Sequence, residues 1–269
     1  MFNVDDISGI GDHILAYKIV EKKYVENIVN RGQIYFGLLE NYRRMENISG
    51  NSIGDRYEAS LSTMIAEYIK IDGKYVEIHG PTTGCNARIN ANQCAFCFYM
   101  VGLKAFDKCT DGRYTYTISS SDLDVLCQDK GGVENCAIIT FDINTIGKIY
   151  DELKQRKLYF ASNKVIYDDF HYKPENPIDS WKYAIECAFH KLKIFSYQNE
   201  FRIVALNTAK QPIDDLFIDV TPDDFQVLSL KSGHDFCSNI ELQVSPIDDK
   251  IVGVHFTFSQ NLQTNGNNK

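Results

Sequence analysis

The stretch FSYQNEFRIVAL, residues 195–206, combines an apolar strand pattern with three polar residues at alternate positions. Side chains alternate between the two faces of a strand, so a strand here would place Gln198, Glu200 and Arg202 on one face. A carboxylate beside a guanidinium is favoured in its ionised form. The pattern therefore predicts a charged hydrogen-bond acceptor, Glu200, on a strand whose other residues are mostly apolar.

Two interpretations of this polar face are open. Polar alternation is the ordinary signature of a half-exposed strand, in which Glu200 and Arg202 would form cross-strand pairs worth about 0.2–1 kcal/mol each. The face could instead line a cleft, where Glu200 would hold a sugar hydroxyl or stabilise a positively charged, sugar-like transition state. Val204 falls on the same face, which indicates partial cover and favours a site.

The rest of the chain predicts alternating strands and helices. Residues 13–20, 21–32 and 33–38 have the pattern strand, helix, strand, with Gly32 as the glycine that ends the helix. Residues 64–71 and 74–80 predict a hairpin that turns at Asp72 and Gly73. Further strands are expected at 94–102, 136–143, 164–169, 195–206, 216–220, 225–230, 240–244 and 250–258, and helices at 40–47, 121–129, 145–157 and 181–195.

These elements predict one α+β domain over residues 1–258, with one or two mostly antiparallel sheets. Neither an internal repeat nor a glycine-rich linker divides the sequence. The polar residues 259–269 predict a disordered tail. With 269 residues, of which 44% are hydrophobic and 24% charged, the chain is long enough for a sizeable core.

Composition limits the classes of function. A net charge of −8 gives no global basic field to hold nucleic acid, and Lys182, Lys191 and Lys193 are expected on a solvated helix face. No run approaches the roughly 18 apolar residues of a membrane span, and the acidic N-terminus is unlike a secretory signal. These features predict a cytoplasmic protein with no membrane contact. The eight cysteines are expected as free thiols, and Cys94 with Cys97 lacks the second ligand pair that a zinc site needs, so no metal site is predicted.

Several catalytic motifs are absent from the sequence. It has no GxGxxG after a strand, no GxxxxGK[ST] and no HExxH, which excludes the usual forms of dehydrogenases, P-loop enzymes and zincins. What remains is a set of polar residues inside or beside apolar segments. Besides the three already named, these are Tyr17, Tyr35, Asp55, Glu58, Ser162 and Asn163.

A first strand with Tyr17, a helix ended by Gly32, a second strand and a late YQNEF, residues 197–201, resemble the ADP-ribosyltransferase superfamily. Its members share a split, mostly antiparallel sheet. They carry an aromatic, His or Arg residue on the first strand, a Ser or aromatic residue on a middle strand, and Gln/Glu-x-Glu on a late one. The resemblance implies that Glu200 is the catalytic glutamate and that Gln198 meets the acceptor.

The same resemblance implies NAD as the substrate. It would be bound by Tyr17 or Tyr35, stacked on nicotinamide, and by Ser162 and Arg202. In the loop at 53–59, Asp55 and Glu58 would position the acceptor, or Arg56 would hold the pyrophosphate of NAD.

A second resemblance covers more of the chain. Residues 35–59, 94–100, 164–169 and 195–206 are similar, in order and spacing, to a large bacterial family of unsettled function. That family has an N-D-P-x-E-like loop, a C-F-S-like strand, a V-x-Y strand and a terminal E-x-E-[FYW]-R, and its genes are often found near phage-defence or mobile-element genes. This similarity supports the placement of the motifs more than an activity. Taken with the first resemblance, it implies an ADP-ribosyltransferase that acts as a toxin or phage-defence effector on a nucleic acid or protein acceptor, with an antitoxin or other neutralising partner.

Two other classes of function stay open. A metal-dependent nuclease would use Asp55, Glu58 and Glu200 as carboxylate ligands of a divalent ion that bridges substrate phosphates. A non-enzymatic sensor would use the same polar residues to hold a nucleotide or a protein without turnover.

Overall fold

A computed structural model of the chain describes residues 13–42, 61–62, 68–71, 74–77, 86–87, 93–109, 113–168, 185, 187–206, 216–222, 225–229, 234–244 and 251–262. These residues form a mixed α+β fold with mostly antiparallel sheets, which confirms the predicted fold class at that level. Among the helices described, none has the length and apolar character needed to cross a membrane.

The chain divides into two compact units. The first comprises Met1–Ile34, Phe98–Glu152 and Ile218–Lys269, and the second comprises Tyr35–Cys97 and Leu153–Phe217. The prediction of a single domain over 1–258 stays a prediction. Strand β18 extends to Leu262, into the range predicted as a polar tail, and residues 263–269 lie outside the described ranges.

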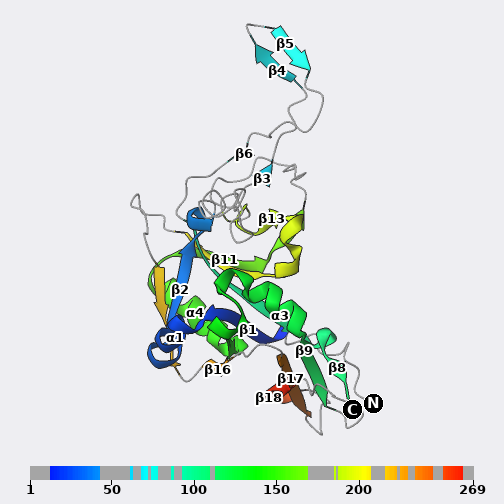
Figure 1. Cartoon of the computed structure of the whole chain (residues 1–269). Helices are drawn as coiled ribbons and strands as arrows, with labels where there is room; N and C mark the ends of the chain where they lie inside the picture. The colour runs from blue at the N-terminus through cyan, green and yellow to red at the C-terminus, as the bar shows by residue number, and fades with distance from the viewer. Residues whose placement is uncertain are drawn as a thin grey trace, which may run out of the picture. The chain divides into compact units, whose positions relative to one another are not determined.

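Figure 1 shows the elements in chain order, coloured from blue to red. The strands are β1 (His13–Glu21), β2 (Gln33–Leu38), β3 (Leu61–Ser62), β4 (Tyr68–Ile71), β5 (Lys74–Glu77), β6 (Asn86–Ala87), β7 (Gln93–Gly102), β8 (Asp107–Lys108), β9 (Tyr114–Ile118), β10 (Cys136–Phe141), β11 (Tyr159–Lys164), β12 (Ile166–Asp168), β13 (His190–Leu192), β14 (Phe201–Leu206), β15 (Leu216–Asp219), β16 (Phe225–Ser229), β17 (His234–Val244) and β18 (Ile251–Leu262). The α-helices that lie wholly within the described residues are α1 (Val25–Arg31), α3 (Ser120–Cys127) and α4 (Ile143–Gln155), and the 3-10 helices there are η2 (Lys22–Tyr24), η3 (Leu103–Ala105), η4 (Gln128–Lys130), η5 (Val133–Asn135) and η6 (Lys193–Gln198).

The core of the first unit forms around β1. This strand pairs antiparallel with β10 and with β7, and β10 pairs with β16. Leu15, Tyr17 and Ile19 alternate along β1 and pack in one cluster with Phe236 and residues of α3. Each fully buried side chain of this size stabilises the fold by about 1.5–3 kcal/mol, so these residues of β1 contribute much of the stability of this core.

Gly32 links α1 to β2 in a left-handed conformation. Its φ is 65°, and its N–H donates to the carbonyl of Ile28 at 2.9 Å, which confirms the predicted helix end. Its carbonyl accepts from the N–H of Val220 at 2.8 Å, so the turn is also fastened to the segment after β15. A Cβ at this position would lie 1.7 Å from the Val220 carbonyl oxygen. Both φ and space therefore require glycine here.

The second unit contains β14, the strand at the end of the stretch 195–206. Strand β14 pairs antiparallel with β11, and Ile203, Val204, Ala205 and Leu206 are all fully buried. Because neighbouring residues point to opposite faces, both faces of β14 are covered. Val204 and Leu206 pack with Leu39, Phe189 and others in a second core cluster. Burial on both faces therefore fixes the position of β14 and of the point at which residues 195–200 join it.

Several predicted elements need correction. The helix predicted over 181–195 is wrong beyond Cys187, because 190–192 form strand β13 and 193–198 form η6. The strand predicted over 195–206 begins only at Phe201. The hairpin is confirmed, with β4 and β5 paired from Tyr68↔Glu77 to Ile71↔Lys74.

Ser238 on β17 carries a buried hydroxyl that has no hydrogen-bond partner among the described residues. An unpaired buried polar group costs about 1–3 kcal/mol. We expect Ser238→Ala to raise the free energy of unfolding, measured by urea denaturation, by about 1 kcal/mol. Ser119→Ala is the control, because its hydroxyl accepts from the Asp122 N–H at 3.2 Å and caps α3. That control should lose about 1 kcal/mol; a loss in Ser238→Ala would contradict the prediction.

Candidate functional site

The polar stretch forms a 3-10 helix, a left-handed residue and then a strand. Helix η6 ends at Gln198, and Asn199 follows with φ 39° and ψ 47°, its N–H donating to the carbonyl of Ser196 at 3.2 Å. Asparagine tolerates this conformation better than most residues. The prediction that Gln198, Glu200 and Arg202 share one face of a single strand is therefore wrong, because only Arg202 lies in β14.

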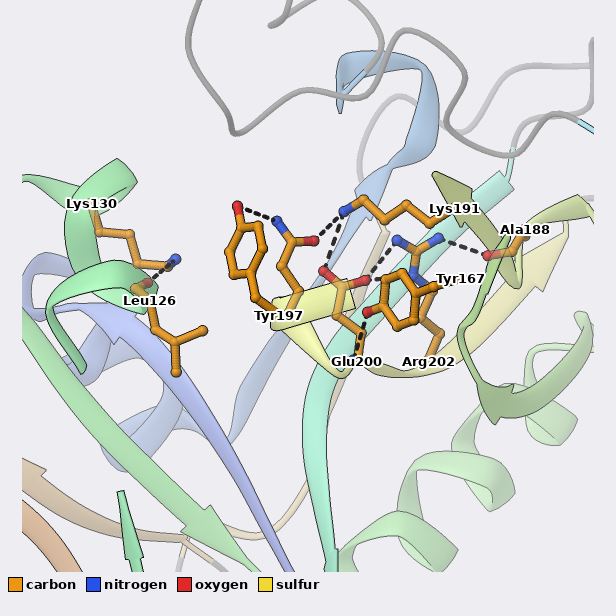
Figure 2. A network of polar contacts seen from close by, with 9 residues as sticks. Leu126, Lys130, Tyr167, Ala188, Lys191, Tyr197, Glu200 and Arg202 are labelled. Atoms are coloured by element: carbon orange, nitrogen blue, oxygen red, sulfur yellow. Dashed lines mark hydrogen bonds and ion pairs between the residues drawn. The ribbon is translucent and has the colours of Figure 1, made fainter. Parts of the chain in front are cut away.

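Glu200 and Arg202 nevertheless lie together (Figure 2). The Nε and Nη2 atoms of Arg202 donate to Oε2 of Glu200 at 2.9 and 2.7 Å, and Nη1 donates to the carbonyl of Ala188 at 2.7 Å. Arg202 is 1% exposed, and the Glu200 side chain is 16% exposed. A guanidinium with so little exposure is tolerated because its donors are matched to acceptors. Glu200 is thereby held as a carboxylate.

Lys191 on β13 brings Gln198 and Glu200 together. Its Nζ donates to Oε1 of Gln198 and lies 3.5 Å from Oε1 of Glu200. The same ammonium lies 5.0 Å from the centre of the Phe195 ring, within the range of a cation–π contact. Figure 2 shows the Lys191 side chain pointing toward Glu200. Lys191 is only 3% exposed, so the expectation that it lies on a solvated helix face is wrong.

Tyr167 on β12 fixes the main chain at Glu200. Its hydroxyl accepts from the Glu200 N–H at 2.9 Å, and the Glu200 carbonyl accepts from the Val165 N–H at 2.9 Å. Burial, and next the charge of Glu200, raise the pKa of Tyr167 well above its usual range. The phenol therefore stays neutral at physiological pH, and Glu200 is held at its backbone as well as at its carboxylate.

Three of the other predicted residues lie in the described part of the chain. Tyr17 is 3% exposed in the core of the first unit, and its ring stacks on Tyr99 with 4.7 Å between ring centres. Tyr35 on β2 is 42% exposed and lies beside Phe217. Ser162 is a half-buried residue of β11 paired with Ile203. The predictions for Asp55, Arg56 and Glu58 fall outside the described residues.

Two sets of potential ligand side chains lie in the described residues, the cysteine pair of β7 and the carboxylate of Glu200. Cys94 and Cys97 lie three positions apart in β7, so their side chains point to opposite faces of the strand. Within the described ranges no group of three His, Cys, Asp or Glu side chains could hold a metal ion. Glu200 meets an ammonium and a guanidinium instead, and these contacts favour its ionised form.

The sequence pattern missed Lys191 and Tyr167. Lys191 stands nine positions before Glu200 in a segment with helical spacing of apolar residues, and Tyr167 stands 33 positions before it. Contacts between residues so far apart along the chain leave no local pattern in the sequence. No family model, no curated protein and no solved structure matches the chain.

Proposed function

We propose that the chain transfers ADP-ribose from NAD to a nucleic acid or protein acceptor, with Glu200 as the catalytic carboxylate. The observation that carries the proposal is the meeting of Gln198 and Glu200 at the ammonium of Lys191. The two residues of the Q-x-E pattern are thus held as one polar group, although they are not neighbours on a strand face.

The chemistry needs an ionised carboxylate beside the reacting sugar. The bond between the nicotinamide nitrogen and C1′ of the ribose breaks, and nicotinamide leaves with the bonding electron pair. Positive charge develops on the ribose, which Glu200 would stabilise while accepting a hydrogen bond from the 2′-hydroxyl. A nucleophile of the acceptor then bonds to C1′ and releases its proton to solvent water. Gln198 would orient that nucleophile.

The contacts of Glu200 fit this role. Its Oε2 accepts both N–H groups from Arg202, whereas its Oε1 has the longer 3.5 Å contact with Lys191. Oε1 is therefore the oxygen that we assign to the ribose hydroxyl. Of the two tyrosines expected to stack on nicotinamide, Tyr35 is exposed and Tyr17 is buried against Tyr99, so we assign that contact to Tyr35. The split-sheet arrangement, the acceptor, and a role in phage defence or as a toxin belong to the same proposal.

The test is release of nicotinamide and transfer of label from adenine-labelled NAD. We expect Glu200→Gln to lower the rate about 10²–10³-fold, the usual effect of removing one electrostatic contact to a transition state. The control is Glu21→Gln, which removes a carboxylate paired with Lys23 at an exposed site. That variant should keep the wild-type rate. Both variants should give the wild-type circular dichroism spectrum.

Two outcomes would reject the proposal. One is equal NAD turnover by the wild type and by Glu200→Gln. The other is no turnover of NAD by the wild type with mixed RNA, DNA and cell protein as acceptors. If the protein instead cleaves nucleic acid without NAD and loses this activity with a chelator, a metal-dependent nuclease replaces the transferase.

A further inference from the structure

Lys191 is an ammonium group buried inside the second unit. With 3% exposure it has lost almost all of its water, and an unpaired charge in such a place would cost several kcal/mol or titrate away. Three contacts offset this cost: Oε1 of Gln198, Oε1 of Glu200 and the ring of Phe195. All three contacts come from the segment 195–200. Residues 195–200 therefore stabilise the buried charge of Lys191.

Lys191 decides which way the Gln198 amide points. An ammonium has only donors, so the amide must present its oxygen to Nζ. The amide nitrogen then faces the other way, and Nε2 of Gln198 donates to the hydroxyl of Tyr197 at 3.4 Å. Tyr197 is 43% exposed, so this nitrogen lies on the side of the network that meets solvent. Gln198 is thus set as a hydrogen-bond donor toward an incoming group.

Lys191 also contacts residues on both sides of a turn. Asn199, in the left-handed conformation, separates the end of η6 from the start of β14. Arg202 already holds the Glu200 carboxylate, so without Lys191 the Gln198 side chain would choose its rotamer independently of Glu200. Holding both Oε1 atoms at one ammonium removes that freedom, and preorganisation of this kind lowers the cost of reaching a transition state.

We propose that Lys191 is a positioning residue, which sets the orientation of Gln198 and the charged state of Glu200 for transfer chemistry. The inference rests on the proposed function, because Glu200 is the group it serves. Lys191 does not touch the reacting atoms. The described charged or titratable groups that face Glu200 include Lys191 from β13, Arg202 from β14 and Tyr167 from β12, while η6 contributes the uncharged Gln198.

The test uses Lys191→Met, which keeps the length of the side chain and removes its charge. The control is Lys193→Met, because Lys193 is exposed at the start of η6, two positions away. The titration of Glu200 is followed by NMR of carboxyl-labelled glutamate, with the resonance assigned from Glu200→Gln. We expect the pKa of Glu200 to rise in Lys191→Met, because a nearby cation favours the carboxylate. It should be unchanged in Lys193→Met.

Activity provides the second measurement. We expect Lys191→Met to lower kcat for nicotinamide release about 10- to 100-fold, the range for losing a group that orients a ligand-binding residue. KM should change much less, and Lys191→Arg should recover part of kcat. A Lys191→Met protein that folds and leaves both the Glu200 titration and kcat at wild-type values would overturn the inference.

If Lys191→Met does not fold, the coupling between Lys191 and Glu200 is tested from the side of Glu200. Coupling between two titrating groups is reciprocal, so Glu200→Gln must lower the pKa of Lys191, followed by NMR of its labelled side chain. An unchanged Lys191 titration overturns the inference. The NMR measurements need no NAD. Coupled titrations in a wild type that releases no nicotinamide would therefore reject the proposed function while supporting the coupling of Lys191 to Glu200.

Discussion

Gly32→Ala is expected to lower the free energy of unfolding by about 3 kcal/mol or more. A left-handed φ of 65° costs an alanine about 1–2 kcal/mol. The larger part comes from space, because the new Cβ would lie 1.7 Å from the carbonyl oxygen of Val220. That segment cannot simply move away, since the Val220 N–H donates to the Gly32 carbonyl at 2.8 Å. Urea denaturation followed by circular dichroism measures the loss.

Gly147→Ala is the matched control with the opposite sign. Gly147 lies inside α4, and a Cβ there meets no atom within 4 Å. Alanine in a helix interior is about 0.5–1 kcal/mol more favourable than glycine, so this variant should be more stable than the wild type. Gly32→Asn separates the two causes at Gly32, because asparagine tolerates the left-handed φ but keeps the clash. Wild-type stability in Gly32→Ala would contradict the assigned turn.

Local signals predicted the parts of the fold that local physics determines. Gly32 was recognisable because a helical spacing stops there and the next residues alternate. The strand at the start of the chain and the hairpin of β4 and β5 were likewise predicted. At the helix end and in the hairpin, neighbours in sequence supply the contacts, so the pattern and the structure agree. Strand β1 was predicted although its partners β7 and β10 are distant in sequence.

Residues 188–199 were misread because contacts distant in sequence decide their structure. The apolar spacing of 181–195 favours a helix, but β13 pairs in parallel with β12, and the Ile166 N–H donates to the Phe189 carbonyl at 2.7 Å. Pairing with a strand some 24 positions earlier has no local signature. Asn199 is a similar case, because asparagine permits the left-handed conformation without requiring it.

The candidate site could be predicted only in part for the same reason. Glu200 and Arg202 are two positions apart, so their contact follows from the chain itself. Lys191 and Tyr167 reach Glu200 from β13 and β12, and only the parallel pairing of those strands brings them to it. The sequence pattern predicted a solvent-exposed Lys191, because burial of a side chain depends on the assembled unit.

Arg202→Met is expected to lower the free energy of unfolding by about 3–5 kcal/mol, the usual loss on breaking a buried ion pair. Its guanidinium is 1% exposed and satisfies two acceptors, Oε2 of Glu200 and the carbonyl of Ala188. Methionine fills similar space but leaves both acceptors unpaired. Arg202→Lys should recover little, because a single ammonium cannot replace three N–H groups in a fixed fork. Urea denaturation at neutral pH is the measurement.

Arg156→Met is the matched control for Arg202→Met. Arg156 also donates to a main-chain carbonyl, that of Phe217 at 2.6 Å, but it is exposed, so its loss should cost less than about 1 kcal/mol. In the double variant Arg202→Met with Glu200→Gln the carboxylate is gone, and the combined loss should fall short of the sum by about 1 kcal/mol or more. Additive losses, or equal effects at Arg156 and Arg202, would show that Glu200 does not depend on Arg202. Glu200 would then be an ordinary half-solvated carboxylate, and the orientation on which its proposed role depends would be lost.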